Sequence, residues 1–250
     1  MRRKLVVGNW KMNGSIAKNK LLLDSVIAGV QPLQHVDCVV CVPYPYLCQT
    51  QALALGTKLM WGAQNLCASE DSVLTGGVSA HMLVDYGCRY VIVGHSERRM
   101  LSHETDDTAA ARFNAAIKAG LTPIFCMGET KDERESDWTE YMVGRQLDSI
   151  LRRFGPEVVA KAVLAYEPLW AVGTNNPATP EQAQQVHQFI RHRVAKCDAR
   201  VAKSVRILYG GSIQPSNAAA LFAMPDIDGG LVGRCSLDAQ AFVAICAAAN

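Results

Sequence analysis

Short runs of apolar residues recur along the chain, and between them lie longer stretches in which apolar positions return every three or four residues. Short apolar runs rich in β-branched side chains are typical of buried strands, and the longer spacing is typical of amphipathic helices. Eight runs predict strands within residues 4–8, 37–42, 58–63, 89–94, 121–126, 162–166, 205–210 and 227–233.

Four of the intervening stretches predict helices, within residues 15–30, 106–120, 137–155 and 180–197. The last has clear start signals, because Thr179 can cap it, Pro180 fits its first turn and Glu181 follows. Alternating strands and helices imply parallel pairing with right-handed crossovers.

Eight such units in 250 residues match the size of a closed (β/α)8 barrel. A doubly wound open sheet is the competing α/β architecture, but no G-x-G-x-x-G sequence follows the first strand. No linker rich in Pro, Gly or Ser and no run of charges divides the chain. We therefore expect a single domain over residues 1–250.

Composition limits the partners and the location. A net charge of +2 with 19% charged residues indicates no surface for nucleic acid. The apolar part of the N-terminus, residues 5–7, is too short for a signal peptide, and no run reaches the length of a membrane span. We expect a cytoplasmic protein without a membrane partner.

Nine cysteines are scattered along the chain, and Cys38 and Cys41 form the only C-x-x-C pair. Residues three apart on a strand point to opposite faces, so this pair is not expected to bind a metal. The odd count favours reduced thiols. No H-x-x-x-H sequence is present either, and we expect no metal site.

Residues just after the strands of such a barrel converge at one end, so they can be considered as a set. The polar members of this set are Asn9, Lys11, Asn13, Gln64, Asn65, His95, Ser96, Glu97, Glu167 and Ser212. Glycines at Gly173, Gly210, Gly211 and Gly233 accompany them. Glycine lets backbone amides approach a phosphate, and several such turns at one end favour a site for a small anion.

Three side chains in this set suit proton transfer. Glu167 can abstract a proton, His95 can exchange one with an oxygen, and Lys11 can stabilise an oxyanion. His95 follows a strand and opens a predicted helix, whose amides are expected to lower the pKa of the ring and keep it neutral. The residues alone therefore indicate an enzyme that enolises a small phosphorylated carbonyl compound.

The motifs GNWKMN, GAQN, GHSERR, CMGET, AYEPLWAVGT, YGGS and DIDGGLVG span almost the whole chain. In this order and spacing they resemble the triosephosphate isomerase family, the namesake of the TIM barrel. The resemblance implies cofactor-free interconversion of dihydroxyacetone phosphate and glyceraldehyde 3-phosphate, in glycolysis and gluconeogenesis, through an enediol or enediolate. This family is itself a standard example of a histidine kept neutral, so the argument for His95 is not independent of the resemblance.

The resemblance also implies a role for each matching residue. Glu167 would be the base, His95 the electrophile and proton carrier, and Lys11 would offset negative charge. Asn9 would help to hold the substrate oxygens, and Glu97 would support the site from beside His95. Backbone amides of the phosphate site would come from Gly173, Ser212, Gly233 and Arg234.

Two loops resemble functional loops of the family. The mobile lid would comprise Pro168, Leu169, Trp170, Ala171, Val172, Gly173, Thr174, Asn175, Asn176, Pro177 and Ala178. Its closure would exclude water from Glu167, and Tyr209 and Ser212 would meet the closed lid. Residues 65–79 resemble the loop through which Thr75 would reach the active site of a second subunit, so we expect a homodimer.

Three departures from the family pattern are evident. Asn, Asn and Pro occupy positions 175–177, and the proline would stiffen the hinge of the lid. Gly77 stands where the family usually has a Glu that pairs with the equivalent of Arg98, so one ion pair between subunits would be missing. Arg234 replaces the second glycine of the phosphate loop, and we expect its side chain to point elsewhere.

Two other functions stay open. Another phosphate-binding barrel enzyme would share the glycine turns but has no reason to carry both GNWKMN and GHSERR. A catalytically idle relative, kept as a binding or scaffold protein, would be favoured by loss of Glu167, His95 or Lys11, and all three are present.

Overall fold

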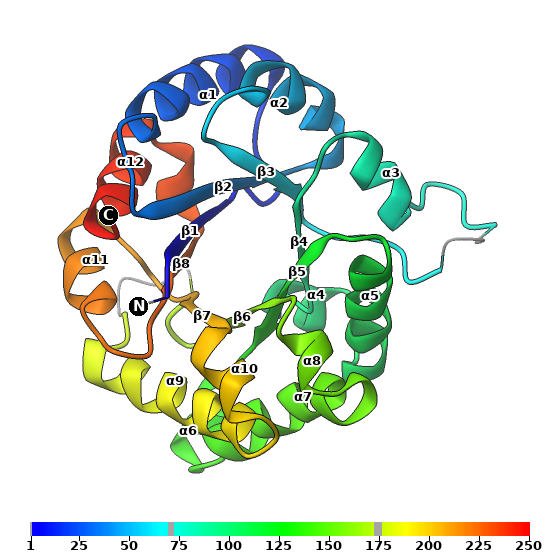
Figure 1. Ribbon diagram of the computed structural model, residues 1–250, viewed down its shortest axis with the longest axis vertical. Helices are drawn as coiled ribbons and strands as arrows, with labels where there is room; N and C mark the ends of the chain where they lie inside the picture. The colour runs from blue at the N-terminus through cyan, green and yellow to red at the C-terminus, as the bar shows by residue number, and fades with distance from the viewer. Residues whose placement is uncertain (1, 70–72, 173–176) are drawn as a thin grey trace.

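The computed structural model describes residues 2–69, 73–172 and 177–250, and it confirms the predicted closed barrel (Figure 1). Neighbouring strands are parallel and follow chain order, and the last strand pairs with the first. The strands are β1 (Lys4–Asn9), β2 (Val36–Val42), β3 (Met60–Ala63), β4 (Tyr90–Val93), β5 (Thr122–Met127), β6 (Val163–Tyr166), β7 (Arg206–Tyr209) and β8 (Gly229–Val232).

Helices form a ring outside the barrel (Figure 1). They are α1 (Ile16–Val30), α2 (Leu47–Ala54), α3 (Ala80–Asp85), α4 (Ser96–Leu101), α5 (Asp106–Lys118), α6 (Lys131–Glu135), α7 (Thr139–Phe154), α8 (Pro156–Val159), α9 (Pro180–Ala195), α10 (Ala199–Ser204), α11 (Pro215–Phe222) and α12 (Ala239–Ala248), with the 3₁₀ turns η1 (Tyr44–Tyr46) and η2 (Arg234–Leu237). The four predicted helices correspond to α1, α5, α7 and α9. Thr179 caps α9 as predicted, because its side chain accepts a hydrogen bond from the amide of Gln182. Within the described residues, no helix combines the length and the apolar character that crossing a bilayer requires.

Strand side chains alternate between two apolar layers. Leu5 and Val7 belong to the cluster inside the barrel, whereas Val6 belongs to the layer between strands and helices. The same alternation separates Cys41, inside, from Cys38, outside, as predicted for the C-x-x-C pair. Because apolar side chains fill the barrel interior, a ligand has to bind at one of its ends.

The amino end of the barrel is tied together by charged side chains. Arg206 at the start of β7 donates to Asp37 on β2 at 2.8 Å and to the hydroxyl of Tyr90 on β4 at 3.2 Å. Asp228, just before β8, is buried and pairs with Arg191 at 2.7 Å. These contacts fix the strand starts relative to one another, and hence the positions of the residues at the opposite end.

Candidate active site

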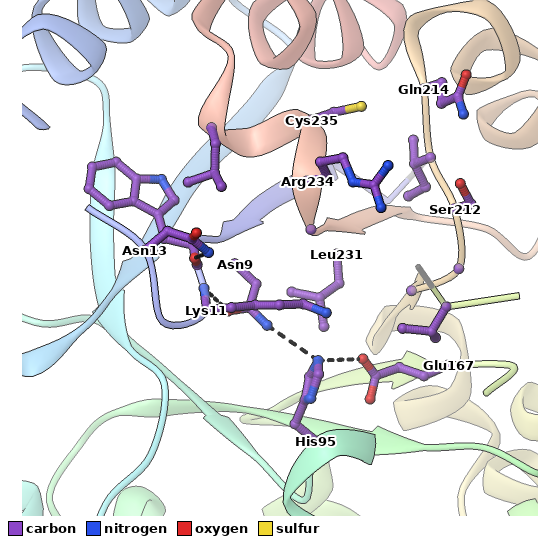
Figure 2. A pocket seen from close by; sticks show the side chains of 17 residues that line it. Asn9, Lys11, Asn13, His95, Glu167, Ser212, Gln214, Leu231, Arg234 and Cys235 are labelled. Atoms are coloured by element: carbon purple, nitrogen blue, oxygen red, sulfur yellow. Dashed lines mark hydrogen bonds and ion pairs between the residues drawn. The ribbon is translucent and has the colours of Figure 1, made fainter. Parts of the chain in front are cut away.

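A cavity of about 340 Å³ at the carboxyl ends of the strands brings Asn9, Lys11, His95 and Glu167 together (Figure 2), whereas the fifth predicted catalytic residue, Glu97, does not line it. Asn9 ends β1, and Lys11 follows it by two residues. His95 lies two residues after β4, and Glu167 directly follows β6. The parallel register therefore gathers side chains that are far apart in the sequence.

Glu167 is almost fully buried, with 2% of the residue exposed. Its Oε1 lies 2.9 Å from Nε2 of His95, and its Oε2 accepts the amide of Ser96 at 3.0 Å. Burial alone raises the pKa of this carboxyl, but His95 and the Ser96 amide outweigh burial, and the net pKa is lowered. The carboxylate is thus kept charged in a place shielded from water, as a base for carbon acids requires.

Two glycines leave space for Glu167, one for its side chain and one for its backbone. A Cβ at Gly210 would lie 2.7 Å from Cγ of Glu167, and a Cβ at Gly128 would overlap the carbonyl oxygen of Glu167. Neither position can therefore carry a side chain without moving the base. The sequence interpretation gave Gly210 to the phosphate turn and gave Gly128 no role, because only the folded chain shows what faces a glycine.

The GHSERR motif opens a helix as predicted, and His95 is the N-cap of this helix, α4. Its Nδ1 accepts the amide of Glu97 at 3.2 Å, so the proton of the ring lies on Nε2, facing Glu167. The expected lowering of its pKa is wrong: burial lowers the pKa, but the Glu167 carboxylate outweighs burial and raises it overall. The expectation considered only the amides at the start of the helix, whereas the Glu167 carboxylate also faces the ring. The Glu97 amide still opposes protonation of Nδ1.

Lys11 adopts a φ of 52°, which is uncommon for a residue other than glycine. Its amide donates to Oδ1 of Asn9 at 3.0 Å, its carbonyl accepts Nε2 of Gln64 at 3.0 Å, and its ammonium pairs with Glu97. Asn9 also places Nδ2 3.2 Å from Nε2 of His95. The uncommon backbone conformation of Lys11 is therefore held by the same neighbours that position its ammonium.

Ser212, Gly233 and Arg234 line the other end of the cavity. The amides of Ser212 and Gly233 have no acceptor in the described part of the chain, so they are free to bind an anion. A Cβ at Gly233 would lie 4.0 Å from Nζ of Lys11, which places this turn beside the cation. Gly173, the remaining predicted phosphate residue, lies outside the described residues.

The Arg234 side chain contradicts the expectation that it would point elsewhere. Arg234 lines the cavity, and its side chain points towards the side of Ser212 (Figure 2). Arg234 directly follows Gly233 and is the first residue of η2, where its side chain is exposed.

Both described ends of the predicted lid are held by polar contacts, whereas residues 173–176 lie outside the described residues. Trp170 donates from Nε1 to Oε1 of Glu129 at 3.0 Å, and the guanidinium of Arg134 lies 4.6 Å from the centre of its indole ring system. At the other end, the amide of Ala178 donates to the hydroxyl of Tyr209 at 3.2 Å. Glu129 is a contact that the sequence interpretation missed, although it lies within the CMGET motif.

Comparison with known proteins agrees with this geometry. The sequence model of the triosephosphate isomerase family matches residues 4–249. The chain belongs to the triosephosphate isomerase family. Triosephosphate isomerase from Thiobacillus denitrificans is 56% identical over 250 residues, covering 100% of this chain and 99% of the relative. The triosephosphate isomerases of Nitrosomonas europaea (52% over 249 residues, 100% and 99% covered) and Dechloromonas aromatica (53% over 250 residues, 100% of both) are similar along their full length too.

This member of the triosephosphate isomerase family has a second cavity of about 360 Å³ beside the first, with Lys11, Glu97 and Arg98 among its lining residues. Arg98 forms an ion pair within the chain, because its Nε donates to Oε2 of Glu104 at 2.7 Å. Gly77 offers no side chain for a further pair. Thr75, on the loop between β3 and α3, is exposed.

Proposed function

We propose that this chain catalyses the cofactor-free interconversion of dihydroxyacetone phosphate and D-glyceraldehyde 3-phosphate, as one barrel domain in the cytoplasm. The observation that carries the proposal is the buried Glu167 carboxylate facing Nε2 of His95 in a single cavity. Full-length similarity to proteins named triosephosphate isomerase supports the same reaction. Such a reaction serves both glycolysis and gluconeogenesis.

Glu167 would take a proton from the carbon beside the carbonyl group and return it to the neighbouring carbon. His95 would meanwhile give its Nε2 proton to one substrate oxygen and recover a proton from the other, so that no net proton is consumed. Both oxygens of Glu167 have partners in the free site, at 2.9 Å and 3.0 Å. Substrate binding would therefore have to replace at least one of these partners.

The remaining residues would bind and stabilise the charge. Lys11 lies beside the turn at Gly233 and lines the same cavity as His95, so its ammonium would face both the developing oxyanion and the phosphate. Asn9 would orient the substrate oxygens, and Glu97 would hold the ammonium in position. Free amides at Ser212 and Gly233 support a phosphate at the far end of the cavity.

The lid, residues 168–178, would close over Glu167 and exclude water from the intermediate. Its described ends contact Glu129 through Trp170 and Tyr209 through Ala178, so closure would hinge between two anchored segments. Val172 already lines the cavity, which supports this placement.

We infer that two copies of the chain form a homodimer. The second cavity lies beside the active site, and Lys11 lines both cavities. Met12 and Val73 are almost fully exposed apolar side chains, on the rim of this cavity and on the Thr75 loop respectively. Insertion of the Thr75 loop of one copy into the second cavity of the other would cover both Met12 and Val73. Sedimentation of wild type and Thr75→Arg tests this inference, and a monomeric wild type would refute it.

The function is tested by a coupled assay of glyceraldehyde 3-phosphate isomerisation without added metal or cofactor. We expect rapid turnover in the wild type and a loss of about 10²-fold to 10⁴-fold in Glu167→Ala, the range for removal of a general base. Glu157→Ala, an exposed carboxylate on α8, is the matched control and should retain wild-type rates. An inactive wild type would favour the idle relative, and attention would turn to residues 175–177.

A further inference from the structure

Arg234 places a guanidinium at the phosphate end of the active-site cavity. It lines this cavity together with Ser212 and Gln214, and its side chain points towards the side of Ser212 (Figure 2). The residue is exposed, and its side chain forms no hydrogen bond or ion pair with the described part of the chain. A cation without a partner at the mouth of an anion site is available to the ligand.

The other charges of the site are already compensated. Lys11 pairs with Glu97, and Glu167 is held by His95 at 2.9 Å. Asp238, the nearest acidic residue along the chain, instead caps α12 by accepting the amide of Ala241 at 2.9 Å. Arg234 is therefore the cation of the cavity mouth that no carboxylate of the described chain neutralises.

A phosphate monoester carries a charge of about −1.5 to −2 at neutral pH, and a guanidinium can bind two of its oxygens at once. We propose that the Arg234 side chain is a phosphate-binding and specificity-determining group, which acts in addition to the backbone amides. It selects dianionic ligands at this end of the cavity, whether the phosphate of a triose or free inorganic phosphate. The proposal rests on the proposed function, because that function puts the phosphate here.

The test compares Arg234→Gln and Arg234→Lys with Arg200→Gln, which removes a 90% exposed arginine on α10, a helix that contributes no residue to the cavity. The measured quantities are KM for glyceraldehyde 3-phosphate and the inhibition constant of inorganic phosphate, at low and high salt. We expect Arg234→Gln to raise both by about threefold to tenfold, a range for a partly solvated charge-assisted contact. Arg234→Lys should recover part of the loss, and the salt dependence should become less steep in Arg234→Gln.

The unphosphorylated substrate D-glyceraldehyde distinguishes the loss of a phosphate contact from a general structural effect of the substitution. The ratio of kcat/KM for the phosphorylated over the unphosphorylated triose should fall by about threefold to tenfold in Arg234→Gln. An equal loss on both substrates, or inhibition constants equal to those of Arg200→Gln, would overturn the proposal. Failure of the proposed function would appear differently, as a wild type without isomerase activity, and phosphate affinity would then be compared by calorimetry.

Discussion

Glu167→Asp separates the position of the base from its charge. Removing one methylene retracts the carboxylate by about 1.5 Å. The present contacts to Nε2 of His95 and to the Ser96 amide, at 2.9 Å and 3.0 Å, would then exceed hydrogen-bond length. A displacement of this size at a reacting group costs about 10²-fold in rate, or about 2.7 kcal/mol of the barrier.

We therefore expect kcat of Glu167→Asp to fall by about 10²-fold to 10³-fold while KM changes little, because the proposed phosphate contacts, at Ser212 and Gly233, lie at the other end of the cavity. Two buried donors would also lose their acceptor, which costs about 1–3 kcal/mol of unfolding free energy unless water replaces it. Urea denaturation measures this second effect independently of activity.

The coupled assay with purified Glu167→Asp, Glu167→Gln and the control Glu157→Asp provides the kinetic comparison. Glu167→Gln keeps the length of the side chain and removes its charge, so it should lose at least as much activity as Glu167→Asp. If Glu167→Asp kept the wild-type kcat and raised only KM, the carboxylate would be a binding group and the assigned role of base would be wrong.

Two further variants test the surroundings of the base, and a third tests the acid stability of the chain. Gly210→Ala should lower kcat by at least about tenfold, because the new Cβ would lie 2.7 Å from Cγ of Glu167, and wild-type kcat would contradict this steric argument. Tyr209→Phe removes the acceptor of the Ala178 amide and should lower kcat by about fivefold or more, equivalent to about 1 kcal/mol, with the far-ultraviolet circular dichroism unchanged. Burial lowers the pKa of His187 from 6.5 to about 4, so the unfolded chain binds more protons and stability is lost as the pH falls from about 6.5 towards 4. His187→Gln should lose less stability over that pH range in urea titrations, and an unchanged slope would exclude His187 as a source of the acid sensitivity.

The fold follows from local patterns in the sequence. Eight short apolar runs alternate with helical spacing, and the parallel connection rules leave few arrangements for such units. The rule that barrel sites lie at the carboxyl ends of strands then brought Asn9, His95 and Glu167 into one set, which the structure gathers in one cavity. Positions just after strands are predictable because backbone direction alone determines them.

Side-chain partners across the barrel were not predictable in the same way. The raised pKa of His95 depends on a carboxylate from another strand, and the space at Gly128 depends on the chain that faces it. Glu129 accepts from both Trp170 and the hydroxyl of Tyr166, each at 3.0 Å, although nothing in its local sequence indicates burial. The direction in which the Arg234 side chain points likewise depends on the residues that surround it in the folded chain.

The resting contacts of Glu167 explain how a buried charge and a strong base can be combined in one residue. A carboxylate that is 2% exposed would be costly without donors, and His95 with the Ser96 amide supplies them. The same donors lower the pKa of the carboxyl, and a low pKa weakens a base. If substrate displaces these donors and the proposed lid excludes water, burial becomes the dominant influence on the pKa of Glu167 and raises it. Basicity would thus increase only while the site is occupied, so the free enzyme can keep Glu167 buried and charged.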